Sequence, residues 1–169
     1  QIDEGCELLS DADELIGHNI IGFDIPVLKD LTRFKTLGEG QRIVDTLVLS
    51  RLFDPVREAG HGLKSWGYKL GSSKIDFKDF TGGFSPEMLD YCIQDVELNL
   101  KVYHALREES RGFSKESLEI EHAVALILKE QEKHGFLYDA MEADLLLADL
   151  RSVVAKTEAK VKHVFKPKV

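Results

Sequence analysis

Apolar residues gather in short blocks along the first part of the chain, and the blocks predict brief strands separated by helices. The first strand is predicted at Leu15-Ile16-Gly17, after a helix end or turn over residues 8–15. A loop with Gly22 follows it. A helix is then predicted from Asp24, which we expect to be the N-cap residue because Pro26 lies just inside the first turn.

A second strand and two more helices are predicted between residues 43 and 71. The strand Ile43-Val44 ends at Asp45-Thr46, which begins a helix that Pro55 terminates. The next helix covers residues 62–70 and is expected to stop at Gly71. Trp66 shares a side of this helix with neighbouring leucines, which favours a place in the core over base stacking.

The strongest helix signal begins at Ser85, an N-cap residue followed by Pro86 at the first helical position. Its apolar residues recur every three or four positions, which predicts one buried face. The residues of this predicted face are Leu89, Ile93, Val96, Leu100 and Tyr103. Cys92 falls in the same stripe and is expected to pack in the core.

The composition changes near residue 110. Residues 107–114 read as a charged linker, and two helices are predicted after it, over residues 117–134 and from Asp139 onward. Asp139 and Glu142 have the spacing of a capping box. We therefore expect an α/β domain over residues 1–110 and an all-α segment over residues 111–169.

The bulk composition is that of an ordinary soluble globular protein, with 43% hydrophobic and 31% charged residues. No apolar run approaches the roughly 20 residues that cross a bilayer, and no signal-peptide pattern opens the chain. The two cysteines, Cys6 and Cys92, form neither a disulfide framework nor a metal-binding spacing. These features predict a cytoplasmic protein with no membrane partner.

The charge is unevenly distributed. A net charge of −8 argues against a general nucleic-acid-coating protein, although it is compatible with a carboxylate site that holds metal ions. Residues 151–169 carry six Lys or Arg and one acid. This stretch is either a solvated helix face or a helix that contacts phosphates, with Lys156, Lys160 and Lys162 as candidate nucleic-acid contacts.

Two groups of residues carry potential chemistry. Asp24 follows an apolar strand at a strand-to-helix junction, where open α/β folds place their ligands, although Asp is also a common N-cap. Tyr91 and Asp95 are four residues apart and share one helix face, which we expect to lie beside the apolar stripe. A surface Tyr–Asp pair would look the same.

Taken together, Asn19-Ile20-Ile21-Gly22-Phe23-Asp24 and Tyr91-Cys92-Ile93-Gln94-Asp95 resemble the second and third motifs of the DEDD exonuclease superfamily, in its tyrosine-bearing branch. The resemblance implies an RNase H-like (DnaQ-like) α/β fold and two divalent ions, Mg²⁺ or Mn²⁺, held by four acids. Asp95 would be a direct metal ligand, Asp24 a ligand either directly or through water, and Tyr91 would position the attacking water.

Further segments resemble phage family A DNA polymerases. They are residues 17–28, 45–52 and 66–71, while residues 119–139 resemble the entry into the polymerase domain. The resemblance implies a proofreading 3′–5′ exonuclease domain followed by the helical start of the polymerase domain, the thumb region. Its partners would be DNA (a single-stranded 3′ end and primer-template), the remainder of the polymerase chain and a possible processivity factor.

One motif of that superfamily is absent. A DxE near the first strand should supply two of the four acids, and Asp95-Val96-Glu97 cannot serve because it lies within the third motif's helix. We therefore expect a fragment that lacks the first strands of the fold and has little or no nuclease activity alone. The alternatives are an RNA-trimming exonuclease of RNase D type, or an exonuclease-like domain kept as a scaffold or DNA-binding module.

The remaining polar residues receive structural interpretations or stay open. Asn19 is expected to shape the second motif and is also a candidate DNA contact, while Phe23 is expected to pack. Asp45 is either a strand-end cap or a site residue. His18 and His61 are expected to have structural or surface roles.

Overall fold

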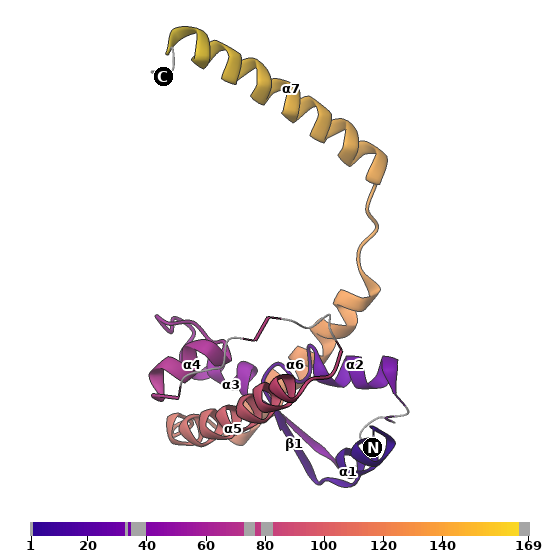
Figure 1. Ribbon diagram of the computed structural model, residues 1–169, viewed down its shortest axis with the longest axis vertical. Coiled ribbons are helices and arrows are strands. Elements are labelled where there is room, and N and C mark those ends of the chain that lie inside the picture. The colour runs from indigo at the N-terminus through magenta and orange to yellow at the C-terminus, as the bar shows by residue number, and fades with distance from the viewer. Residues whose placement is uncertain (1, 33, 35–39, 73–76, 79–82, 166–169) are drawn as a thin grey trace. The chain divides into compact units, whose positions relative to one another are not determined.

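The computed structural model describes residues 2–32, 34, 40–72, 77–78 and 83–165. Figure 1 shows the elements in chain order, which are α1 (Ile2–Asp11), β1 (Glu14–Gly17), α2 (Asp24–Leu31), β2 (Arg42–Asp45), α3 (Thr46–Phe53), α4 (Leu63–Lys69), α5 (Pro86–Glu109), α6 (Lys115–His134) and α7 (Ala140–Val164). The two predicted strands and the main helices are confirmed. The expected helix end over residues 8–15 is instead α1, which ends earlier.

The chain divides into two compact units, Gln1–Lys133 and His134–Val169. Helix α6 therefore belongs to the first unit, although the sequence places it after the linker. The predicted division into an exonuclease domain and a polymerase segment near residue 110 stays a prediction.

The sheet of the first unit is a parallel pair. β1 and β2 are in register from Glu14↔Arg42 to Gly17↔Asp45, and α2 lies in the connection between them. Parallel neighbours require such a crossover, so the pair forms a βαβ unit. Over the described residues the fold is mixed α/β and mostly helical, and the RNase H-like assignment stays a proposal.

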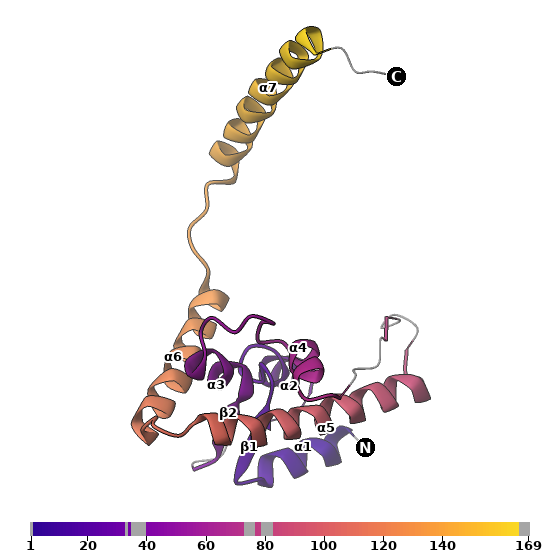
Figure 2. The ribbon, with the colours of Figure 1, turned by 90° about the vertical axis from the view of Figure 1, so that its left-hand side faces the viewer.

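Two apolar clusters form the core of this unit. Successive strand residues point to opposite faces, so Leu15 packs with α1 and α2, while Val44, the partner of Ile16, packs with the other cluster. That second cluster joins α3, α4 and α5 (Figure 2) through Leu49, Trp66, Leu98, Val102 and Leu106. The predicted core position of Trp66 is confirmed, since 1% of its surface is exposed.

The predicted buried face of α5 is wrong. Leu89, Ile93 and Leu100 are exposed, and Val96 is exposed over 70% of its surface. Cys92, expected in the same core stripe, is exposed as well. The neighbouring helix face is buried instead and is formed by Leu98, Val102 and Leu106. Both faces have a helical period, so periodicity alone could not choose between them.

The turn that follows α4 depends on a glycine. A Cβ at Gly67 would lie 2.6 Å from the Ser72 carbonyl oxygen, whereas its 3.4 Å distance to the Leu98 side chain of α5 is close to an ordinary packing distance. Only a residue without a side chain allows the Ser72 carbonyl to come so close. The predicted stop of α4 at Gly71 is confirmed by its left-handed backbone, with φ of 64°.

A charged cluster covers Trp66. The Arg57 guanidinium lies 4.4 Å and the Lys69 ammonium 4.6 Å from the Trp66 ring centroid. Both cations bind Glu109, with Arg57 Nη2 at 2.6 Å and Lys69 Nζ at 2.9 Å from its carboxylate oxygens. The cluster fixes the end of α5 against α4 and the segment after α3.

The second unit consists mainly of α7. As predicted, the Asp139 side chain caps this helix by accepting a 3.0 Å hydrogen bond from the backbone N–H of Glu142. No side chain of α7 is buried, and none of the helices in the described ranges has the length and apolarity that a membrane crossing requires.

We predict that Glu109→Gln destabilises the protein in a pH-dependent way. Partial burial works to raise the pKa of Glu109, but the hydrogen bonds from Arg57 and Lys69 outweigh it and hold the pKa below its ordinary value of 4.5. A carboxylate with a lowered folded pKa contributes stability above its unfolded pKa, and that stability is lost as the pH falls through the folded value. The substitution should therefore cost about 1–3 kcal/mol at pH 7 and progressively less below pH 4.5.

The measurement is the free energy of unfolding in urea at pH 7 and at several acidic values. Glu108→Gln is the matched control, because the neighbouring Glu108 forms an exposed pair with Arg111 and should lose less than about 0.5 kcal/mol. An equal loss in both variants would contradict the prediction.

Candidate active site

The carboxyl ends of the two parallel strands bring together the loop before α2 and the start of α3. Gly17 and Asp45 are register partners, so both strands end at the same edge of the sheet. In open α/β folds this edge carries the ligands. The segment from His18 to Asp24 follows the end of β1, and Asp45-Thr46 lie at the end of β2 and the start of α3.

Asp45 anchors both segments from a buried position, with 1% of its surface exposed. Its Oδ1 accepts hydrogen bonds from the backbone N–H groups of Asn19 and Leu47, each at 2.9 Å. Its Oδ2 accepts a third, at 3.1 Å, from the N–H of Ile21. Of the two roles left open by the sequence, the cap is therefore observed. Asp45 has a second role that was not predicted, because it also anchors the loop that leads from His18 to Asp24, here called the motif loop.

The motif loop has the shape that its residue types allow. Asn19 has a left-handed backbone with φ of 64°, which Asn tolerates better than most residues. A Cβ at Gly22 would overlap with the Asn19 side-chain oxygen, so this glycine lets the amide fold over the loop. Asn19 thus shapes the motif as expected. The predicted packing of Phe23 is wrong, because 61% of its surface is exposed.

Asp24 lies at the start of α2, but it is not the N-cap. Phe23 occupies that position, and Asp24 is the first helical residue. Asp24 is exposed overall, but partial burial of its carboxyl group raises its pKa. A hydrogen bond from its own backbone lowers the pKa, and the negative charge of Asp45 raises it further, so that the pKa of Asp24 lies above its ordinary value. The two carboxylates are therefore close enough to interact electrically.

A polar network ties α5 to the same edge. Thr46 is buried and donates a 2.7 Å hydrogen bond to Asn99 Oδ1, while His18 Nδ1 lies 2.9 Å from the Thr46 hydroxyl. Asn99 Nδ2 in turn donates to the Ile16 carbonyl at 3.4 Å. This network fixes α5 against the carboxyl end of β1.

Tyr91 and Asp95 lie on the inward face of α5. They were predicted to lie next to the apolar stripe of Leu89 and Ile93, and it is that stripe which is exposed. Tyr91 and Asp95 are half-buried, and they continue the stripe of Leu98 and Val102 toward the start of the helix. Asp95 is one turn before Asn99. The Tyr91 ring lies 5.7 Å from the ring of Phe77.

The predicted site residues are therefore only partly assembled. Asp24 and Asp95 come from two elements that meet at one sheet edge, but over the described ranges no group of three or more His, Cys, Asp or Glu is arranged to hold a metal ion. Lys156, Lys160 and Lys162 belong to α7, in the other unit. His18 and His61 make structural hydrogen bonds as expected, to Thr46 and Ser50.

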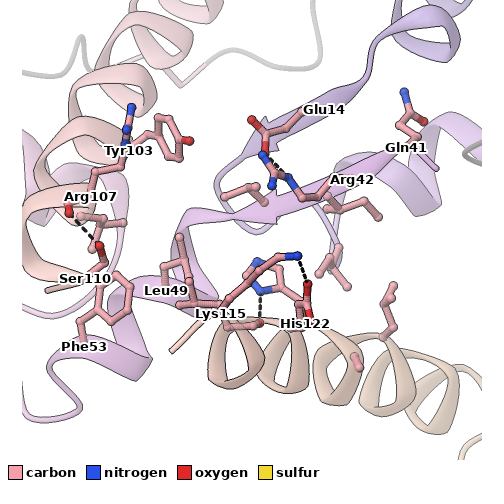
Figure 3. Close-up of a pocket in the computed structure, with 18 residues that line it drawn as sticks. Glu14, Gln41, Arg42, Leu49, Phe53, Tyr103, Arg107, Ser110, Lys115 and His122 are labelled. Atoms are coloured by element: carbon pink, nitrogen blue, oxygen red, sulfur yellow. Dashed lines mark hydrogen bonds and ion pairs between the residues drawn. The ribbon is translucent and has the colours of Figure 1, made fainter. Parts of the chain in front are cut away.

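A cavity of about 570 Å³ lies elsewhere in the first unit, between β2, α5 and α6 (Figure 3). Its lining includes Leu49, Tyr103 and His122, but neither Asp24, Tyr91 nor Asp95. This cavity therefore does not contain the predicted site residues, and the candidate site is defined by the carboxylates at the sheet edge.

Comparison with known proteins supplies independent evidence. No protein-family model matches the chain. The chain is 26% identical to the DNA-directed DNA polymerase of Escherichia phage T7 over 206 aligned residues, covering 89% of the chain and 29% of that polymerase. It is 27% identical over 191 residues to the DNA-directed DNA polymerase of Enterobacteria phage T3, covering 80% of the chain and 27% of that polymerase.

The similarity thus extends over most of the chain, which spans less than a third of the length of these curated relatives. The chain is related to a region of phage DNA polymerases.

We predict that Asp45→Asn destabilises the first unit by about 1–3 kcal/mol, because an amide nitrogen cannot accept and leaves at least one backbone N–H at the motif loop unsatisfied. The measurement is urea unfolding at pH 7, with Asp90→Asn on the exposed side of α5 as control. The control should change by less than about 0.5 kcal/mol. Equal stability of Asp45→Asn and the parent chain would refute the role of Asp45 as anchor.

Proposed function

We propose that this chain is part of the proofreading 3′–5′ exonuclease region of a phage-type family A DNA polymerase, with an RNase H-like fold. The similarity to the two phage polymerases supports the polymerase part of the proposal. The exonuclease part rests on Asp24, Tyr91 and Asp95, in the motifs that resemble those of the DEDD superfamily. The proposed parent acts in the cytoplasm of a bacterial or phage-infected cell.

The position of α5 is the observation that carries the exonuclease proposal. The face that bears Tyr91 and Asp95 points inward, and one turn later Asn99 is bonded to the end of β1. The motif loop with Asp24 leaves from the same strand end. A packed α5 with the opposite face inward would have turned the motif residues to solvent and removed the basis for a shared site.

The carboxylates fit the expected metals in kind but not in number. Hard divalent ions such as Mg²⁺ or Mn²⁺ prefer carboxylate oxygens, which Asp24 and Asp95 supply. Two such ions, when bound, would activate water and stabilise the leaving oxygen. Two carboxylates do not hold two ions, and no larger group occurs in the described residues. The missing acids would come from a DxE in a strand, whereas the DxE of this sequence, Asp95-Val96-Glu97, lies within α5.

This chain's own residues would hold the metal ions and orient the attacking water. Asp24 and Asp95 would contribute oxygen ligands from two separate elements, each fixed by hydrogen bonds or packing to the same sheet edge. The Tyr91 hydroxyl would orient a water molecule for attack on the terminal phosphodiester. Burial, and in addition the Asp45 charge, raise the pKa of Asp24; of these causes, the negative charge of Asp45 would also favour a cation at the edge.

A second candidate is an exonuclease-like domain that serves the polymerase as a scaffold or DNA-binding module. The incomplete acidic group favours it. An RNA-trimming enzyme of RNase D type has less support, because the similarity to phage DNA polymerases covers 89% of the chain, including most of the region after the linker.

The nuclease proposal is tested with 3′-labelled single-stranded DNA and Mg²⁺. The 169-residue chain is expected to release nucleotides only at the background rate. In a longer polymerase chain that supplies the DxE acids, Asp95→Ala should lower the exonuclease rate by roughly 10²–10³-fold, the usual effect of removing one electrostatic catalytic group. Glu97→Ala, on the exposed side of the same helix, is the control and should leave the rate unchanged.

An exonuclease rate in the longer chain that is indifferent to Asp95→Ala would refute the assignment of Asp95. Absence of a DxE from the longer chain would instead favour the scaffold.

DNA binding by α7 is the remaining part of the proposal. Lys156 and Lys160 are one turn apart on an exposed face, whereas Lys162 pairs with Glu158 at 3.6 Å. Each lysine that neutralises a phosphate releases condensed counterions, which makes the affinity fall with salt.

We predict that Lys156→Gln and Lys160→Gln each reduce the slope of log affinity against log salt by roughly 0.7–0.9. The measurement is a salt titration of binding to primer-template DNA. Lys129→Gln is the control, because Lys129 forms an ion pair with Glu132 on α6. An unchanged slope in both α7 variants would leave these lysines as a solvated helix face.

A further inference from the structure

His122 reaches from α6 to the end of β2. It projects into the cavity between α6 and the sheet (Figure 3), and it is half-buried there. The backbone N–H of Asp45 donates a 2.9 Å hydrogen bond to His122 Nε2, although the two residues are 77 positions apart in the sequence. On its other side, His122 Nδ1 lies 2.7 Å from the carbonyl oxygen of Leu118.

These two contacts allow only one form of the imidazole. A backbone N–H can only donate, so Nε2 must carry a free lone pair. A backbone carbonyl can only accept, so Nδ1 must carry the proton. The two contacts are therefore those of the tautomer with its proton on Nδ1, in which each ring nitrogen has one fixed task.

The residue that His122 binds is also the anchor of the motif loop. The Asp45 carboxylate accepts from the N–H groups of Asn19 and Ile21, within the loop that leads to Asp24. A continuous chain of hydrogen bonds thus runs from Leu118 on α6 through His122 and Asp45 to that loop. Helix α6 is thereby connected to the candidate site.

We propose that His122 is a positioning residue, through which α6 sets the backbone of Asp45 and with it the motif loop that carries Asp24. The consequence for nuclease activity rests on the proposed function, but the positioning itself does not. Positioning by His122 makes the order of the motif loop depend on whether α6 is packed against the end of β2. Helix α6 lies in the segment that follows the linker.

Substitution of His122 by glutamine or by asparagine distinguishes between the two tasks of the imidazole. Glutamine can place an acceptor oxygen where Nε2 lies, so His122→Gln should keep the bond to Asp45. Asparagine is one methylene shorter, reaches only the position of Nδ1 and should lose that bond. Both are polar and differ little in helix propensity on the scale of the expected effect.

The experiment is hydrogen exchange and NMR on the 169-residue chain, neither of which requires nuclease activity. The imidazole ¹⁵N shifts of His122 should report a proton on Nδ1 and none on Nε2. In His122→Asn, protection of the amides of Asn19, Ile21 and Asp45 should fall by roughly tenfold or more, while that of Val102 in the α5 core changes by less than about threefold. In His122→Gln all four amides should stay within about threefold of the parent chain.

His134→Asn, at the exposed end of the same helix, is the control and should change none of the four amides. Three outcomes would overturn the proposal: a proton on Nε2, unchanged loop protection in His122→Asn, or equal losses in the Gln and Asn variants. A chain that passes these tests but whose longer form lacks exonuclease activity would refute the proposed function and leave the positioning role intact.

Discussion

The buried carboxylate of Asp45 holds together the segments on which the candidate site depends. It accepts three backbone hydrogen bonds, two from the loop after β1 and one from the first turn of α3. A buried carboxylate is costly unless its oxygens are satisfied, so the loop and the helix must take up their positions together. The backbone N–H of the same residue adds His122 and brings α6 into the arrangement. One residue, through its side chain and its backbone N–H, thus connects the loop after β1, the start of α3 and α6.

The orientation of α5 is the second constraint, and it decides which residues can share a site. Thr46 and Asn99 bind this helix to the end of β1, and the core residues Leu98 and Val102 lie on the same face. Tyr91 and Asp95 are carried inward by that choice. The opposite face leaves several apolar side chains exposed, among them Ile93 and Val96. Polar bonds therefore direct the helix as much as apolar burial does.

The candidate site residues are connected to one edge of the sheet. Asp24 follows the loop that the buried Asp45 anchors, and Asp95 lies one turn before Asn99, which is bonded to the end of β1. The similarity to phage DNA polymerases is spread over most of the chain, whereas the proposed exonuclease role rests on the motif residues. The proposed positioning by His122 would place the geometry of that edge under the influence of the following helix.

The sequence by itself determined the local features of this protein. Caps such as Ser85 and Asp139, and the glycine stop at Gly71, act within one turn of the chain, so their residue types suffice to predict them. The motif residues were also identified from spacing and resemblance. Only the tertiary structure decided which face of α5 is buried, that Phe23 and Cys92 are exposed, and that Asp45 joins His122 to the motif loop. These outcomes depend on contacts between distant segments, and two helix faces with the same period are distinguished only by the partners that they meet.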